Sequence, residues 1–163
     1  MQEKINQITQ ALNSWLERNG FEVRVIGDAD DFCWWSIDNT IEYSVLASNK
    51  HLDFWSELLD ELGLNYNIDP FYSSFLHEVG HSMTFEDFEE EELEEYYETL
   101  ELMDEEPSSF AEDITWVYFN LPIEITATKW MVNYINSHFE AVKNLVDTVR
   151  PLLITYLEAR TSI

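Results

Sequence analysis

The segment that decides the fold covers residues 69–83 and reads DPFYSSFLHEVGHSM. Asp69 followed by Pro70 is typical of a helix start, with an N-cap carboxylate and a proline in the first turn. Apolar residues then recur every three or four positions, at Tyr72, Phe75, Leu76, Val79 and Met83. This spacing predicts a helix over residues 70–83 whose apolar face packs against the core.

The same helix carries His77, Glu78 and His81 in an H-E-x-x-H arrangement. Residues four apart lie on one helix face, so both imidazoles can bind one Zn²⁺ ion. Glu78 lies about one hundred degrees round the helix from His77, where a carboxylate can hold a metal-bound water and act as a general base. Gly80 leaves room for another element to approach. The alternative is a histidine pair beside a solvated glutamate, without a metal.

A catalytic zinc site needs a third protein ligand. The longer form of the motif would require glycine at position 84 and histidine or aspartate at position 87, whereas the chain has Thr84 and Asp87. Asp87 is one candidate ligand, but this pair also fits the start of a further helix, with Thr84 as its N-cap.

A second candidate ligand is Glu124, in the segment LPIEITATKW of residues 121–130. Pro122 predicts a helix start here, and Glu124 is the only acid in a mostly apolar stretch. Buried carboxylates are rare unless they are paired. Metal ligation explains this residue, and the alternative is stabilisation of the helix dipole from the first turn.

Together, His77-Glu78-x-x-His81 and the downstream Glu124-x-x-Ala127-x-x-Trp130 resemble the gluzincins, the thermolysin-like zinc peptidases, in a minimal form. They also resemble the compact ImmA/IrrE-type peptidases of mobile genetic elements. The resemblance implies a zincin-like fold, with His77, His81 and Glu124 as zinc ligands and Glu78 as the base. It further implies that the strand Ile41–Ala47 is the sheet edge along which an extended peptide substrate lies.

The chain departs from the gluzincin pattern at two points. Gluzincins often carry an aspartate four residues after the glutamate ligand, and this chain has Thr128 there. No clear histidine is available to stabilise the transition state, because no motif surrounds His51 or His138. A tyrosine, Tyr118 or Tyr134, is the candidate for that role.

The remaining elements are predicted from the hydrophobic period. A helix is expected over residues 3–19, followed by three strands near residues 21–25, 32–37 and 41–45 that form an antiparallel meander. Helices are then expected over residues 51–62, 70–83, 84–103 and 122–135. A further segment begins with a capping-box pattern at Ser109 and is interrupted by Pro122, and a last helix carries apolar residues from Val142 to Leu157 on one face. The predicted fold class is α+β, one domain over residues 1–163 with a small sheet followed by a helical bundle.

An acidic helix is predicted as an insertion at about residues 84–106. Residues 86–106 contain 13 acids in 21 positions, with apolar residues three or four apart between them. The simplest interpretation is a helix with one packed stripe and a solvated acidic face. The alternatives are a cradle for a cationic substrate, a cation-binding surface or phosphate mimicry, and the position between His81 and Glu124 favours the cradle.

The charge and the cysteine content of the chain exclude several classes of function. The 8 Lys and Arg against 33 Asp and Glu give a formal net charge of −25, which argues against direct binding of nucleic acid or an anionic membrane. Cys33 is the only cysteine, so an internal disulfide is excluded. Neither a signal peptide nor a membrane span is recognised, and a cytoplasmic location is expected.

The sequence therefore predicts a zinc metallopeptidase with a peptide or protein substrate, basic substrates being favoured by the charge. Its cofactor would be Zn²⁺. The alternative is an acidic decoy or nucleic-acid mimic of a phage or mobile element, in which any metal site is structural or vestigial.

Overall fold

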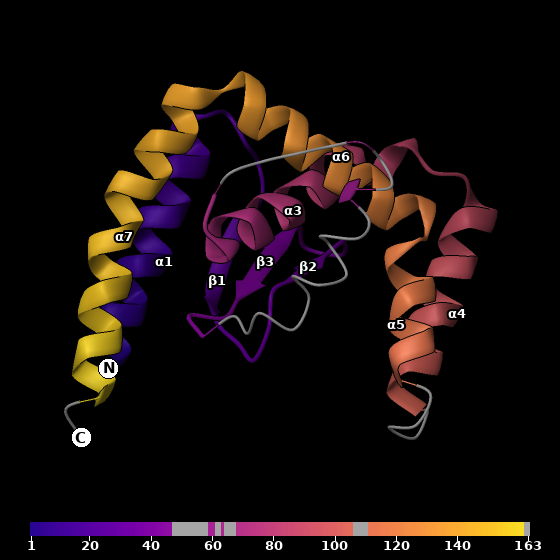
Figure 1. Cartoon of the computed structure of the whole chain (residues 1–163), viewed down its shortest axis with the longest axis horizontal. Coiled ribbons are helices and arrows are strands. Elements are labelled where there is room, and N and C mark those ends of the chain that lie inside the picture. The colour runs from indigo at the N-terminus through magenta and orange to yellow at the C-terminus, as the bar shows by residue number, and fades with distance from the viewer. Residues whose placement is uncertain (47–58, 61–62, 64–67, 106–110, 162–163) are drawn as a thin grey trace.

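The computed structural model describes residues 1–46, 59–60, 63, 68–105 and 111–161. The described elements form an arch (Figure 1). Helix α6 (Pro122–Ser137) runs along the top, α1 (Gln2–Arg18) and α7 (Phe139–Thr161) descend on one side, and α4 (Glu90–Glu105) and α5 (Ala111–Phe119) on the other. Helix α3 (Pro70–Thr84) and the sheet lie between the two arms.

The α+β prediction is confirmed, and α1, α3 and α6 begin and end within two residues of the predicted bounds, whereas the acidic helix expected from residue 84 begins at Glu90. The other elements are β1 (Arg24–Asp28), β2 (Cys33–Trp35), β3 (Thr40–Tyr43) and the short 3₁₀ helix η2 (Phe85–Asp87). Most of the helix expected over residues 51–62 lies outside the described residues. Pro70 and Pro122 both occupy the first turn of their helices, as predicted.

The prediction of an antiparallel meander is wrong, because the sheet is mixed. Its strand order is β1-β3-β2, with β1 parallel and β2 antiparallel to β3. The first strand also begins at Arg24, later than its alternating pattern suggested. Phe21, which opens that pattern, instead stacks on Trp15 of α1 at a centroid distance of 5.6 Å. Apolar packing against α1 therefore sets where the strand begins.

The prediction of a substrate edge at Ile41–Ala47 is wrong over β3, and Ala47 lies outside the described residues. Strand β3 is central and pairs on both sides, so it has no open edge. On one outer strand, the Asn13 side chain accepts a hydrogen bond from the Val25 N–H and donates one to the Val25 carbonyl, both at 2.8 Å. This amide replaces a neighbouring strand at that point of β1. The other outer strand, β2, lies next to α3.

The core lies between α1, the sheet, α3, α6 and α7. Trp15 is fully buried at its centre, and its indole N–H donates to the Ala141 carbonyl at 2.8 Å. The Trp15 ring also meets Phe75 of α3 and Tyr134 of α6 edge to face. Trp15 of α1 therefore contacts α3, α6 and α7, and burial of such a large ring contributes strongly to the stability of the core.

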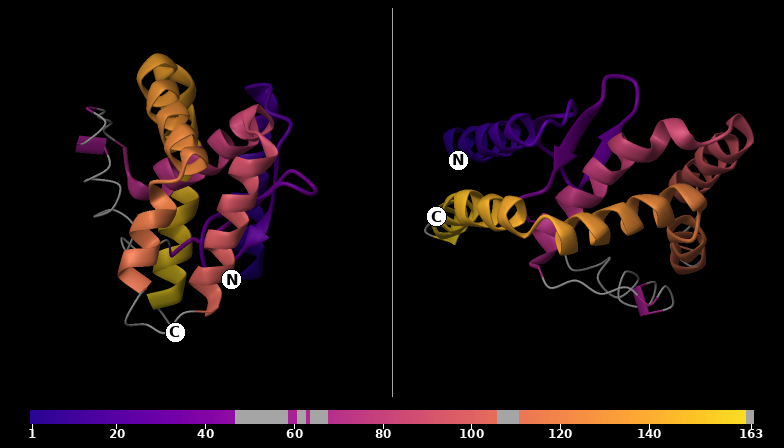
Figure 2. Two further views of the ribbon diagram at one scale, coloured as in Figure 1. Left: turned by 90° about the vertical axis from the view of Figure 1, so that its right-hand side faces the viewer. Right: turned by 90° about the horizontal axis from the view of Figure 1, so that it is seen from above.

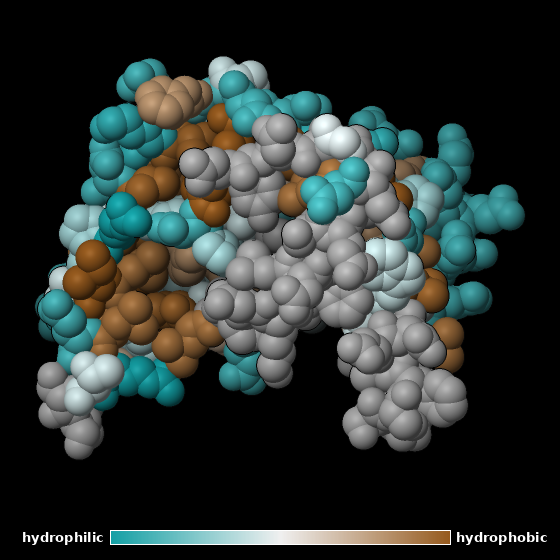
Figure 3. Space-filling view, in the orientation of Figure 1, coloured by the Kyte–Doolittle hydropathy of each residue, from teal (hydrophilic) through white to brown (hydrophobic). Residues whose placement is uncertain are grey.

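Helix α7 packs along α1, and the two lie side by side in Figures 1 and 2. Its buried face carries Val142, Leu145, Val149 and Tyr156, whereas Ile154 and Leu157 remain exposed. In the space-filling view, apolar side chains gather on this side of the molecule (Figure 3). Among the described residues, no helix is both long and apolar enough to cross a membrane.

Helices α3 and α6 make the closest helix contact near the site. The predicted apolar face of α3 is buried except at Met83, which is 49% exposed. Gly80 lies against the α6 backbone, where an added Cβ atom would be 2.7 Å from the Ala127 carbonyl oxygen. Only glycine permits this approach, as the sequence suggested for Gly80.

Gly80→Ala should therefore destabilise the protein. Inside a helix this change normally stabilises by ~1 kcal/mol, but here a methyl group would press on a rigid backbone, at a cost of about 1–3 kcal/mol or more. We expect a lower midpoint of denaturant unfolding, measured by circular dichroism. Ser82→Ala on the same helix is the control and should change stability by less than about 0.5 kcal/mol. A Gly80→Ala protein as stable as the parent would contradict the close contact.

Candidate metal centre

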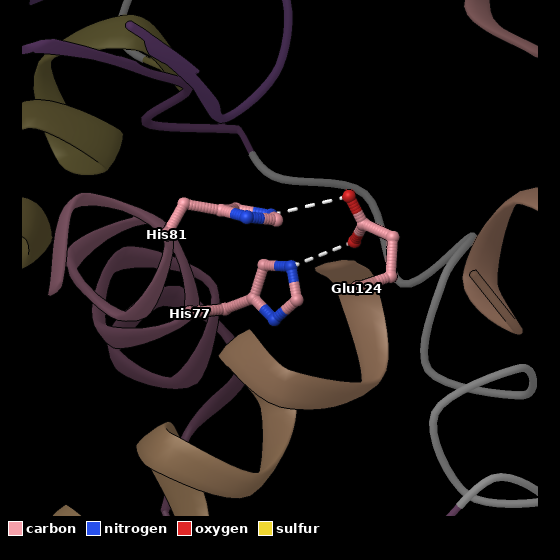
Figure 4. A group of neighbouring side chains, drawn as sticks. All are labelled: His77, His81 and Glu124. Carbon is pink, nitrogen blue, oxygen red and sulfur yellow. Dashed lines mark hydrogen bonds and ion pairs between the residues drawn. The ribbon is translucent and has the colours of Figure 1, made fainter. Parts of the chain in front are cut away.

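Three buried side chains from two helices meet at one point (Figure 4). His77 and His81 project from α3, one turn apart, and Glu124 projects from the first turn of α6. The His77 Nε2 atom lies 2.9 Å from Glu124 Oε2, and the His81 Nε2 atom lies 3.1 Å from Glu124 Oε1. The third residue proposed from the sequence as a ligand, Glu124, is therefore brought to both histidines.

The geometry and donor set of this cluster fit a metal ion. The candidate ligand atoms all lie within 4.8 Å of one another, compared with about 3.4 Å between ligands in a tetrahedral zinc site with bonds of ~2.1 Å. Glu124 Oε1 is buried and meets His81 Nε2 at 3.1 Å as an ion pair without a well-aligned hydrogen bond, so it keeps a lone pair that a metal could use. Two imidazoles and one carboxylate form a ligand set that leaves a fourth position open.

Electrostatics hold the cluster together without a metal. Burial alone would raise the pKa of Glu124, but His81 and His77 hold it far below its usual range through charge and hydrogen bonding. Burial alone would lower the pKa of His81, yet the adjacent Glu124 carboxylate raises it above its usual value. Because a metal must displace the proton that His81 retains, metal binding should weaken as the pH falls.

Thr128 supports His77 from one turn further along α6. Its hydroxyl lies 3.2 Å from His77 Nδ1, and the residue is fully buried. When Nε2 faces a metal, Nδ1 carries the proton, and the Thr128 oxygen can accept it in a hydrogen bond. The sequence marked Thr128 only as a departure from the gluzincin pattern, whereas the structure places its hydroxyl on a candidate ligand.

Glu78 is buried and lies next to His77 on α3, beside the cluster. Its burial raises its pKa, while the histidines and a hydrogen bond from the backbone of Trp34 oppose the rise. Trp34, on strand β2, also stacks its ring on His81 at a centroid distance of 6.1 Å and an interplanar angle of 11°. This contact of Trp34 could not be predicted from local sequence patterns, because it depends on how β2 meets α3.

A cavity of about 230 Å³ opens beside the cluster, and its lining includes His77, Glu78, Glu124 and Tyr118. Of the two tyrosines considered from the sequence, Tyr118 thus lies at the site. Its hydroxyl is 3.3 Å from that of Tyr96 on α4, and its pKa is raised well above the usual value by burial and by Glu124. Tyr134 instead stacks between Trp130 and His138.

The alternative ligand Asp87 does not join the cluster. It is exposed on η2. Thr84 is the N-cap residue of a further helix, η2, as predicted, but its side chain makes no cap hydrogen bond. Thr84 also ends α3, and its hydroxyl donates to the Gly80 carbonyl at 2.9 Å. Asp69 likewise makes no side-chain cap and pairs with Arg150 at 3.0 Å instead. His51 lies outside the described residues.

The cluster predicts one bound divalent metal per chain, lost when Glu124 is changed. Glu124→Gln keeps the volume and removes the charge, so affinity for Zn²⁺ or Co²⁺ should fall by at least about 100-fold. Asp87→Ala should bind as the parent does. Titration with Co²⁺, followed by its visible absorption, measures both. Equal losses in the two variants would contradict the assignment of Glu124.

Thr128→Val should weaken metal binding without removing a ligand. Valine fills the same space but cannot accept the His77 Nδ1 proton, and lost support of this kind lowers affinity by about 10- to 100-fold. Thr126→Val, two positions earlier on α6 and only partly buried, is the matched control. The prediction is wrong if the two valine variants bind Co²⁺ equally well.

No protein-family model, curated protein or solved structure matches this chain.

Proposed function

We propose that the protein is a zinc-dependent metallopeptidase of the gluzincin type, with a zincin-like arrangement of α3, α6 and the sheet. The observation that carries the proposal is the buried His77, His81 and Glu124 cluster, with Glu78 beside it at the wall of one cavity. A purely structural zinc site usually has four protein ligands, often cysteines. A cluster of three ligands that borders a cavity is the arrangement typical of catalysis.

The reaction would be hydrolysis of a peptide bond. The chemistry that a bound zinc ion supplies is Lewis acidity, which polarises the carbonyl and lowers the pKa of a bound water towards about 7. Glu78 would accept the proton of the attacking water and return it to the leaving amine. Burial raises the pKa of Glu78 above that of a solvated carboxylate, which brings its basicity closer to what proton transfer near neutral pH requires.

The substrate chain would lie along β2. Strand β2 is an outer strand of the sheet, and its Trp34 contacts both His81 and Glu78. An extended peptide that adds to this edge through main-chain hydrogen bonds would pass directly over the cluster. The side chains of α4 carry many exposed carboxylates, so basic residues at the ends of such a peptide would be attracted.

The competing function is that of an acidic decoy that occupies the nucleic-acid site of a partner. The exposed carboxylates of α4 are compatible with it, but such a protein would need neither Glu78 nor the metal ligands for activity. The two functions therefore differ in how they depend on Glu78.

Glu78→Gln should abolish peptide hydrolysis and keep the metal. Glutamine preserves the shape but cannot accept a proton, so kcat should fall by about 10²-fold or more. Hydrolysis is measured with fluorogenic peptides, and metal content by atomic emission on the same samples.

Glu78→Asp is the informative control, because it retains a base at an altered distance and should keep part of the activity. If Glu78→Gln cleaves as fast as an active parent, Glu78 is not the base. If the zinc-loaded parent cleaves no peptide, yet captures a DNA-binding protein through α4, the decoy function replaces the proposal.

A further inference from the structure

The acidic helix α4 faces the cavity with its apolar stripe. Leu100 and Met103 of α4 line the cavity together with His77 and Glu78 of α3, and Phe119 of α5 is a further lining residue. The described carboxylates of α4 that are exposed include Glu94, Glu98 and Glu101, and none of the described acids of α4 is among the lining residues. In Figure 3, hydrophilic side chains gather along the right-hand edge, over α4.

The cavity has the size and character to hold one bulky apolar side chain. Its volume of about 230 Å³ exceeds the ~150 Å³ that suffices for a benzene molecule in a protein interior. Its apolar lining residues are Phe32, which precedes β2, and Leu100, Met103 and Phe119. A lysine or arginine head placed among these apolar groups would lose its hydration, which is costly without a dedicated partner.

The acids that line the cavity are engaged or lie at its margin. Glu124 is held by the two histidines, and Glu78 is beside them with a hydrogen bond from the Trp34 backbone. Asp31 is exposed and accepts the Phe32 backbone N–H at 2.8 Å. The exposed carboxylates among the described residues of α4 therefore lie outside the cavity, where they can act on the flanks of a substrate.

We propose that Leu100 and Met103 of α4 determine specificity, so that the protein selects peptides with a large apolar side chain, of leucine or phenylalanine size, next to the cleaved bond. This inference rests on the proposed peptidase function. It assigns the choice of the central side chain to the apolar stripe of α4, and leaves to the carboxylates only an attraction for basic flanking residues. Helix α4 would thus contact the substrate with two faces, an apolar stripe that binds the central side chain and a row of carboxylates that attracts basic flanking residues.

A direct binding experiment tests the pocket without catalysis. The four methionines are Met1, Met83, Met103 and Met131, and labelling their methyl groups with ¹³C gives one NMR signal for each. N-acetylphenylalaninamide should shift the Met103 signal, while exposed Met83 should not move. N-acetylglycinamide, which lacks the side chain, should leave both unchanged. A Met103 signal that ignores the phenylalanine probe overturns the inference.

A kinetic experiment tests the choice of substrate. The peptides share one sequence and vary only at the residues flanking the cleaved bond, with Ala, Leu, Phe or Lys. The parent should prefer Leu and Phe over Ala by about 10- to 100-fold in kcat/KM. Met103→Trp fills the cavity, so this preference should collapse, while the zinc content should stay within about threefold of the parent's.

The matched control is Leu102→Trp, the neighbouring residue on α4, which is 51% exposed and should leave the preference intact. Equal slowing of all peptides by Met103→Trp, or a parent preference for Lys, overturns the inference. The two proposals can fail separately. If the Met103 signal responds to the probe but the protein cleaves no peptide, the pocket binds an apolar side chain and the peptidase proposal is wrong. If the protein cleaves all the peptides equally well, it is a peptidase and the specificity proposal is wrong.

Discussion

The structure depends on how a carboxylate is kept inside the protein. Glu124 is 1% exposed, and an ionised carboxylate at that depth is stable only beside compensating charge and hydrogen bonds. The compensating imidazoles belong to α3, so α3 and α6 must approach each other at a fixed distance. The contact of Gly80 with the Ala127 backbone provides that distance. Helix packing and site geometry are therefore set by the same pair of helices, and neither can change without the other.

Much of the site could be predicted because its signals are local. The spacing of His77 and His81 fixes their common helix face, and Pro122 with an isolated Glu124 marks the second helix. Strand pairing could not be predicted, because alternating residues show which side is buried but do not name the neighbouring strand. Thr128 and Trp34 were missed for a similar reason. Their contacts arise from how α6 and β2 meet α3, which is a property of tertiary packing.

The acidic helix shows how a strong compositional signal can conceal a weaker one. Carboxylates dominate the sequence of residues 86–106, so the functions predicted for this helix were based on its charge. The spacing of Leu100 and Met103 carried the information about which face turns inward, since residues three apart share a helix face. The structure places this stripe at the cavity and many of the acids in solvent. The apolar stripe of α4 therefore contacts the cavity, whereas its exposed carboxylates face solvent.

The way the cluster is neutralised bears on the kind of metal site it can be. Without a metal, the raised pKa of His81 and the lowered pKa of Glu124 make a buried ion pair, so folding need not wait for metal binding. In structural zinc sites the metal itself often supplies the folding energy. Here the large core around Trp15 supplies apolar burial independently of the cluster. A metal bound by these three residues would therefore replace a proton rather than assemble the fold.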